Sequence, residues 1–232
     1  MIEKINIYEN ARINELFLRK NWNIDESNKF SLYNRYLKTY SLLNSDEREL
    51  FSKLSQSFEI VSIEKYQICL ISLMEQIISK HFKTKQIIYI YPIKTSHDSE
   101  LIKSSDLISY LCKSTAIKYI DSICKKKLYV LGSYSQVKKK VNQLEKHSLL
   151  ILDDFIGSGN YATTVAGEIT SNGISKEHLI IGALYACRNG YNKLIEESYI
   201  VECQNIVDSC LPKLSSKEKE YYTYLLYQLF YI

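Results

Sequence analysis

The sequence predicts an α/β fold, a mainly parallel β-sheet flanked by helices, with an N-terminal helical extension. Two patterns in the 232 residues support this prediction. From about residue 86 onward, short β-branched and aromatic runs alternate with segments of helical period. Before that point, apolar residues recur only at helical spacing. We therefore divide the chain into a helical extension, residues 1–84, and an α/β domain with a C-terminal helix, residues 85–232.

Helical spacing is clearest just before the region of the predicted strands. Ser62 is a suitable N-cap for a helix over 62–80. The apolar residues of that helix fall on one face: Tyr66, Leu70, Leu73, Met74 and Ile77. A second helix is expected to open at Ser45, with Leu50 and Leu54 on one face.

Five strands are expected in the second region, and each is followed by a helix or a turn. The first strand, 86–91, is stopped by Pro92, and the most apolar strand is 149–152. The other three strands are expected at 128–131, 179–186 and 199–201. The helices between them are expected at 105–114, 136–146, 160–171 and 189–197. Ligands of such sheets bind beyond the carboxyl ends of the strands, so the site is expected there.

The composition excludes several classes of protein. The net charge of +4 is too small to indicate a nucleic-acid partner. No run approaches the roughly 20 apolar residues that span a bilayer, and the first residues lack the features of a secretory signal. The six cysteines form no C-x-x-C pair and are expected to be reduced thiols. These features together predict a soluble cytoplasmic protein.

The turn after 149–152 carries the strongest chemical signal. The apolar strand delivers Asp153 and Asp154 to its carboxyl end, and a Gly-Ser-Gly loop, 157–159, then leads into a helix. Backbone N–H groups of such a loop and the helix N-terminus favour a phosphate, to which the Ser158 hydroxyl can also donate. Two carboxylates repel phosphate but suit sugar hydroxyls or a divalent cation. The sequence therefore predicts a sugar-phosphate site; the alternative is that these residues merely shape a turn.

This arrangement resembles the phosphoribosyl-diphosphate signature of type I phosphoribosyltransferases: four apolar residues, two acids, two apolar residues and a small-residue loop. The run Asp-Asp-Phe-Ile-Gly-Ser-Gly is most similar to phosphoribosyltransferase-like domains associated with bacterial conflict systems. By this resemblance, Asp153 and Asp154 hold the ribose 2- and 3-hydroxyls and, indirectly through ribose or water, Mg²⁺. The resemblance assigns the 5-phosphate to Gly157, Ser158, Gly159, Asn160, Tyr161 and Thr163.

The segment after Pro92 stands where that fold places its pyrophosphate loop. The resemblance therefore makes four of its residues candidate ligands of Mg²⁺-pyrophosphate: Lys94, Thr95, Ser96 and Ser99. His97 lies in the same loop and is a candidate acid or base. An ordinary polar connection is the alternative interpretation of this loop.

Two departures from the family pattern bear on activity. Gly157 stands where catalytic members usually carry a further Asp that serves as a base, and Tyr161 replaces the Thr that closes the phosphate loop. One hypothesis is a Mg²⁺-dependent glycosyltransferase or hydrolase that acts on phosphoribosyl diphosphate or a nucleotide. The resemblance implies that such an enzyme is a toxin or effector in bacterial defence. The other hypothesis is a catalytically inactive nucleotide-sensing or regulatory subunit that acts through a partner protein. Gly157 in place of an acid and the aromatic C-terminal segment favour it.

Two other motifs resemble the same turn. Residues 157–162 match the dinucleotide fingerprint G-x-G-x-x-A, but the acids between strand and glycines would repel a pyrophosphate there. Residues 153–159 are also similar to Asp-Pro-Phe-x-Gly-x-Gly, the cofactor motif of DNA amino-methyltransferases. That family also needs a Pro-Pro-Tyr motif, whereas Pro92 and Pro212 of this chain stand alone.

The last twelve residues, 221–232, are apolar around much of their circumference if helical. Such a helix needs cover on most sides. We expect it to pack on the N-terminal helices or, alternatively, to contact a protein partner or a second copy of the chain.

Overall fold

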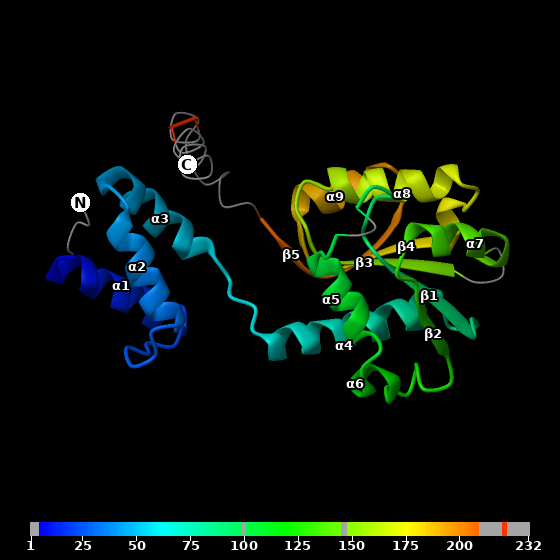
Figure 1. Cartoon of the computed structure of the whole chain (residues 1–232), viewed down its shortest axis with the longest axis horizontal. Helices are drawn as coiled ribbons and strands as arrows, with labels where there is room; N and C mark the ends of the chain where they lie inside the picture. Colours follow the sequence, from blue (N-terminus) through cyan, green and yellow to red (C-terminus); the bar gives the residue numbers. More distant parts are fainter. Residues whose placement is uncertain (1–4, 99–100, 145–147, 209–219, 222–232) are drawn as a thin grey trace. The chain divides into compact units, whose positions relative to one another are not determined.

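The computed structural model describes residues 5–98, 101–144, 148–208 and 220–221 (Figure 1). The chain forms two compact units, one of residues 1–60 and 210–232 and one of residues 61–209. The second unit thus begins at residue 61, whereas the sequence indicated a boundary at 84/85. The helix expected at 62–80 belongs with the sheet.

In the described residues up to 60, the N-terminal unit has three helices whose ends the sequence specifies. They are α1 (Ile7–Arg19), α2 (Leu32–Leu42) and α3 (Ser45–Ser57). The side chains of Asn6 and Asn44 cap α1 and α3, and Glu9 and Glu47 bond back to the capping residues. These reciprocal bonds satisfy N–H groups that a helix start leaves without partners. Ser45, expected to open α3, is its first helical residue.

Aromatic side chains fill the core of this unit. The Phe17 ring is fully buried and meets three other rings edge-on, with centroids 5.1–5.3 Å apart: Trp22, Tyr33 and Tyr36. Edge-to-face contacts are favourable because the positive edge of one ring meets the negative face of another. Part of the high tyrosine content thus serves packing.

The second unit is built on a five-stranded parallel sheet with the order β2-β1-β3-β4-β5, which confirms the predicted fold class. The strands are β1 (Ile87–Pro92), β2 (Lys127–Val130), β3 (Ser148–Ile156), β4 (Leu179–Cys187) and β5 (Ile200–Val207). β3 ends at Ile156 rather than at residue 152. The two acids therefore lie within the strand, near its carboxyl end, and not in the turn that follows.

Helices cover both faces of the sheet (Figure 1). Helices α7 (Tyr134–Leu144), α8 (Asn160–Ser171) and α9 (Arg188–Glu196) cover one face. Helices α4 (Ile63–His81), α5 (Ser104–Leu111) and α6 (Thr115–Lys118) cover the other face. A short 3₁₀ helix, η1 (Lys176–His178), precedes β4. The single helix expected at 105–114 is divided, because α5 ends at Leu111 and α6 begins only at Thr115.

Helix α4 covers the sheet with an apolar face and holds it with a polar cluster. Ser62 caps its start, as predicted. Its buried side chains are Leu70, Leu73, Met74, Ile77 and Ile78. Glu202 on β5 accepts hydrogen bonds from Lys80 (3.0 Å), from His81 and from Gln76. Burial alone would raise the pKa of Glu202, but these bonds outweigh it and lower that pKa.

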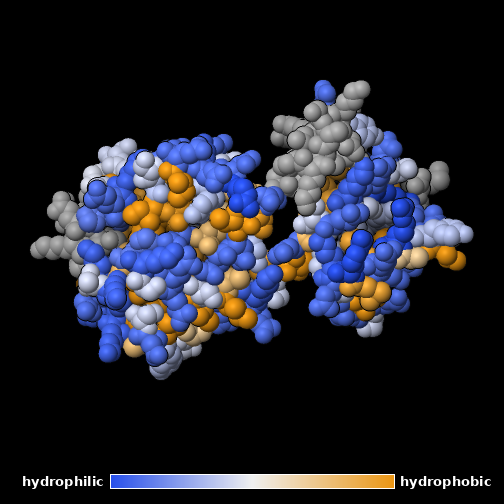
Figure 2. Space-filling model, turned by 180° about the vertical axis from the view of Figure 1, so that it is seen from behind, coloured by the Kyte–Doolittle hydropathy of each residue, from blue (hydrophilic) through white to orange (hydrophobic). Residues whose placement is uncertain are grey.

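The described ranges contain no helix long and apolar enough to cross a membrane. Figure 2 shows hydrophobic side chains on the visible faces as separate patches among hydrophilic ones. The helix expected at 221–232 lies outside the described residues except for Tyr221, whose hydroxyl donates to Asp46 Oδ2 on α3 at 2.7 Å.

Candidate functional site

The strand order creates a switch point between β1 and β3. The chain leaves β1 toward β2 on one side, and β3 then pairs with β1 on the other side. In open α/β sheets, connections that diverge in this way leave a crevice at the carboxyl ends, where ligands bind. β1 ends at Pro92 opposite Leu152, so Asp153 and Asp154 extend past the end of their neighbour.

A pocket of about 370 Å³ lies at this switch point. Its volume falls in the range of small-molecule sites, about 300–1,000 Å³. The lining comes from the end of β3, the residue after β1, the start of α5 and the first turn of α8. The lining residues are Ile93, Lys103, Ser104, Ser105, Asp153, Asp154, Phe155 and Tyr161. The acids singled out in the sequence thus share a pocket with Tyr161.

The two acids of the pocket, called the acid pair below, have different surroundings. Asp154 Oδ1 accepts a hydrogen bond from Ser104 Oγ at 2.7 Å, and the Asp154 N–H donates to Asp153 Oδ1 at 2.9 Å. Burial and then the neighbouring Asp154 side chain raise the pKa of Asp153 to about 8. Asp153 is therefore mostly neutral at pH 7 and can donate a hydrogen bond.

Tyr66 of α4 places a buried hydroxyl near the acid pair. This hydroxyl finds no hydrogen-bond partner among the described residues. Burial raises the pKa of Tyr66 well above its ordinary value, and the charges of Asp154 and Asp153 add to the effect. An unpaired buried hydroxyl is costly, so this one is a group that a ligand or a water molecule can satisfy.

The loop 157–159, called the glycine loop below, is held tightly against α9. Gly159 has a φ of 81° and is the N-cap of α8. A Cβ on Gly190, in the first turn of α9, would stand 2.2 Å from the Gly157 carbonyl oxygen. A Cβ on Gly159 would stand 2.8 Å from the Gly190 carbonyl oxygen. Only glycines allow this approach, and it fixes the loop at the start of α8, where helix N–H groups lack intrahelical partners.

The other residues predicted for the phosphate site divide between two places. Asn160 stands at the start of α8, and its side chain accepts from Lys193 on α9 at 2.5 Å. Thr163 faces α9 instead, with its hydroxyl 3.5 Å from Glu197. Tyr161 reaches from α8 to the loop after β1, where the Thr95 N–H donates to its hydroxyl at 3.2 Å. The glycine loop, Asn160 and Tyr161 are therefore together at the helix start, whereas the side chain of Thr163 is not.

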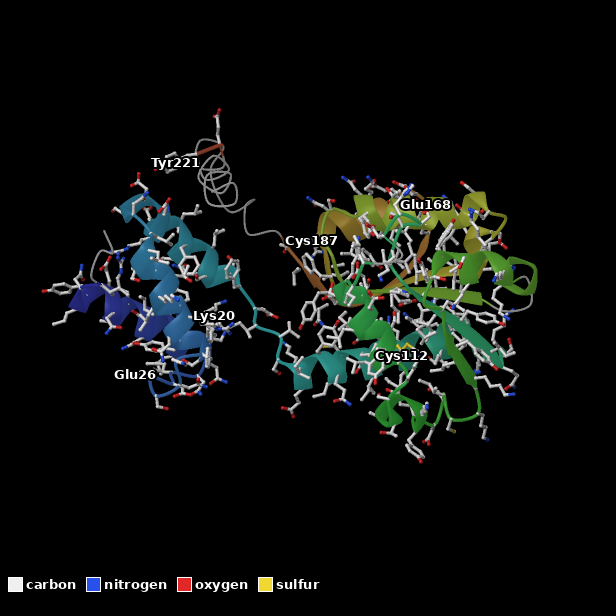
Figure 3. The ribbon with its side chains drawn as sticks, viewed as in Figure 1. Lys20, Glu26, Cys112, Glu168, Cys187 and Tyr221 are labelled. Atoms are coloured by element: carbon white, nitrogen blue, oxygen red, sulfur yellow. The ribbon has the colours of Figure 1, made fainter. Side chains whose placement is uncertain are left out.

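The loop after β1 is arranged differently from the expectation. Lys94 is 3% exposed; its ammonium group lies 2.6 Å from Asp106 and donates to the Leu101 carbonyl. The Ser96 N–H donates to Glu168 at 3.0 Å. Figure 3 labels Glu168 on α8. His97 is exposed, and Ser99 lies outside the described residues. Of the three residues proposed for pyrophosphate that the structure describes, Thr95 donates to a pocket-lining side chain, that of Tyr161.

Lys103 supplies the basic group of the pocket and is not among the site residues that the sequence predicts. Its Nζ lies 2.7 Å from Asp98 Oδ2 and 2.6 Å from the Tyr161 hydroxyl. It also stands 4.2 Å from the centroid of the Tyr161 ring. Lys103 is the N-cap of α5, and Ser104 is its first residue. A basic residue followed by Ser at the start of a predicted helix is the feature of the sequence that could have indicated Lys103 as a site residue.

The described residues contain no group of three or more His, Cys, Asp or Glu side chains able to hold a metal ion. Mg²⁺ commonly binds through one or two carboxylates together with substrate phosphates. The acid pair fits that mode, provided that the substrate supplies the other oxygens.

A larger hollow of about 990 Å³ lies in the N-terminal unit. Acidic and basic side chains line it, and four of them form two ion pairs: Arg48 lies 3.0 Å from Glu9, and Lys53 lies 2.9 Å from Glu49. Paired charges of both signs do not define an anion site, so the pocket at the switch point is the candidate.

The fold and the site define an α/β protein with a candidate phosphate pocket at the carboxyl edge of a parallel sheet. No family model matches the chain, and no curated protein matches it in sequence.

Several solved structures are similar to the chain at low identity. Hypoxanthine-guanine phosphoribosyltransferase from Schistosoma mansoni, in complex with IMP, is 13% identical, with a TM-score of 0.39 over 66% of this chain and 67% of that one. Orotate phosphoribosyltransferase from Aeropyrum pernix is 14% identical, with a TM-score of 0.37 over 66% and 77%. A hypoxanthine phosphoribosyltransferase from Staphylococcus aureus is 13% identical, with a TM-score of 0.39 over 72% and 84%. Likenesses at this level do not show the family.

Proposed function

We propose that this chain binds a phosphorylated ribose, either phosphoribosyl diphosphate or a related nucleotide, together with Mg²⁺. One observation carries the proposal: the acid pair lines one pocket together with Tyr161 of the first turn of α8, and the short glycine loop joins the strand of the acids to the start of that helix. Acceptors for sugar hydroxyls and donors for a phosphate thus stand side by side.

The acid pair is suited to the ribose. Ser104 holds Asp154 in place, and the two carboxyl groups offer oxygens to neighbouring hydroxyls. The start of α8 offers N–H groups to the 5-phosphate, and Gly190 keeps the glycine loop in position. Mg²⁺ would bind between the acid pair and the phosphate oxygens of the ligand.

Two observations bear on turnover, and they favour different candidates. Burial and the neighbouring Asp154 favour the protonated form of Asp153 as long as no cation is bound beside it, and in that form it can give a proton to a leaving group while a glycosidic bond breaks. This favours a glycosyltransferase or hydrolase. Gly157 offers no carboxyl group, which favours a nucleotide-sensing subunit that acts through a partner.

Calorimetric titration with phosphoribosyl diphosphate and Mg²⁺ tests the proposal, with S-adenosylmethionine as the control ligand. We expect saturable heat with the sugar phosphate alone. Asp154→Asn should weaken binding by about tenfold or more, because it removes a charged acceptor. The matched control is Asp208→Asn, an exposed acid after β5 that pairs with Arg188. Heat only with S-adenosylmethionine would revive the methyltransferase, and no heat with either ligand would refute the proposal.

The product distinguishes the two candidates. Release of pyrophosphate or of a free base from the bound ligand would identify the enzyme, whereas binding without product identifies the sensor.

The role in bacterial defence implied by the resemblance has its own assay. Expression in a bacterial cytoplasm should arrest growth, and Asp154→Asn should relieve the arrest.

A further inference from the structure

Ser104 presents a hydroxyl group to the acid pair from the start of α5. It is the first residue of that helix, it is exposed, and it lines the pocket. Lys103 holds the N-cap position, so the Ser104 hydroxyl is not needed as a cap and donates to Asp154 Oδ1 at 2.7 Å. A hydroxyl paired with a carboxylate in this way is the arrangement in which a base activates a nucleophile.

The other nucleophilic groups among the described lining residues are engaged elsewhere. Lys103 and Tyr161 are bonded to each other and both to Asp98. Ser105 is 1% exposed, and its hydroxyl donates to a backbone carbonyl group. Among these four residues, Ser104 is therefore the one that is both exposed and paired with an acid of the site.

We infer that Ser104 is an acceptor of the phosphoribosyl group, so that the chain modifies itself. The inference rests on the proposed function, because that function supplies phosphoribosyl diphosphate as the donor. It goes beyond that function by assigning the acceptor to a side chain of the protein rather than to a free base or water.

The reaction balances without a further reactant. The Ser104 oxygen forms a bond to C1 of the ribose, and its proton passes to Asp154 Oδ1. The bond between C1 and the diphosphate breaks, and its electron pair leaves with pyrophosphate. The second carboxyl oxygen of Asp154 is left to accept from a ribose hydroxyl, so one side chain holds the sugar and the nucleophile together. The product is a serine glycoside of ribose 5-phosphate.

The surroundings favour this acceptor over an external one. Gly157 has no carboxyl group that could activate an external acceptor, and Ser104 already occupies the Asp154 oxygen that could serve as the base. A serine alkoxide is a poor leaving group, so the glycoside persists. The reaction therefore stops after a single turnover of each chain.

Mass spectrometry of the full chain, after incubation with phosphoribosyl diphosphate and Mg²⁺, tests the inference. We expect a gain of one phosphoribosyl group, mapped to Ser104 in the digested protein, and release of one pyrophosphate per chain. Ser104→Ala should abolish the gain, and Ser104→Thr, which keeps a hydroxyl group, should restore it. The matched control is Ser79→Ala on α4, an exposed serine whose hydroxyl donates to a backbone carbonyl group, and this variant should be modified as the parent is.

Other results would overturn the inference. A gain that maps to another residue, or that persists in Ser104→Ala, would exclude Ser104 as the acceptor. Equal modification of Ser104 in the chain unfolded in urea would be spontaneous chemistry, and so would equal modification by ribose 5-phosphate. Mapping in the parent protein gives an answer even if Ser104→Ala does not fold.

Calorimetry on the same samples separates failure of this inference from failure of the proposed function. If the ligand binds and many pyrophosphates are released per chain at unchanged protein mass, the acceptor is external and only the inference is wrong. If the ligand binds without release or mass gain, the chain is the sensor and the inference is again wrong. If no heat is seen and the mass is unchanged, the proposed function itself fails.

Discussion

Two neighbouring acids of one strand acquire different chemistry from their surroundings. Asp154 is bonded to the first residue of α5, whereas Asp153 is buried beside Asp154 and has a pKa of about 8. Repulsion between adjacent carboxylates is relieved when one of them keeps its proton. The pair can thus offer both a proton and an acceptor at one place, which suits a ligand with hydroxyl groups and a leaving group.

The raised pKa of Asp153 predicts how stability changes with pH. The unfolded chain has an Asp pKa of about 3.9, so between about pH 4 and pH 8 the folded state binds more protons. The contribution of Asp153 to stability is complete below pH 4 and is lost as the pH rises through 8, with a slope of at most about 1.4 kcal/mol per pH unit. Urea unfolding at pH 6 and pH 9 should show the loss in the parent and a smaller loss in Asp153→Asn. Equal losses would contradict the assignment.

Gly157 predicts a gain of function. A Cβ at this position would meet only the Phe155 ring, at 3.6 Å, which is ordinary contact. Gly157→Asp should therefore fold and add the carboxyl group that the resemblance leads one to expect there. A positioned base contributes on the order of 100-fold or more to a rate, so product release should rise by about that factor. If sugar-phosphate binding persists without any gain in product, the missing base is not what limits turnover.

Among the elements, the contact between the glycine loop and α9 sets the position of the phosphate donors. Gly190→Ala would place a methyl group 2.2 Å from the Gly157 carbonyl oxygen, so the loop must move. We expect a loss of about 1–3 kcal/mol in unfolding free energy and weaker sugar-phosphate binding. Gly167→Ala on α8 is the matched control, because a Cβ there meets nothing within 4 Å and should stabilise the helix by about 0.5–1 kcal/mol. Equal effects of both variants on binding would refute this role of the contact.

The sequence predicts the elements better than it predicts the site. β3 and α8 follow from local patterns, because an apolar run buried on both faces and a helix after glycines are visible in one segment. The position of Lys94 after β1 makes it a candidate ligand in the sequence, but in the structure it is buried against Asp106, twelve positions away. Lys103 was missed because only the tertiary path of the loop brings the start of α5 to the acid pair. Long-range ion pairs and helix starts leave no periodic signal in a single sequence.

At the scale of the whole molecule, the division of the chain follows burial rather than secondary structure. Four helical segments precede β1, and helical spacing alone groups them together. The fourth, α4, covers one face of the sheet, where it packs in one cluster with Leu150, Leu152, Ile180 and Leu184. A division drawn from helix and strand patterns therefore falls after α4, whereas the compact unit of the structure begins before it.

This division predicts which fragment folds. A fragment of residues 61–209 keeps α4, whereas a fragment of residues 85–209 exposes the sheet face that α4 covers. The five buried apolar side chains of α4 are worth about 1.5–3 kcal/mol each, a sum comparable to the net stability of a whole domain, about 5–15 kcal/mol. We expect cooperative urea unfolding and saturable binding of phosphoribosyl diphosphate from 61–209, and no cooperative transition from 85–209. A cooperative transition in the shorter fragment would show that α4 is dispensable and would return the boundary to residues 84/85.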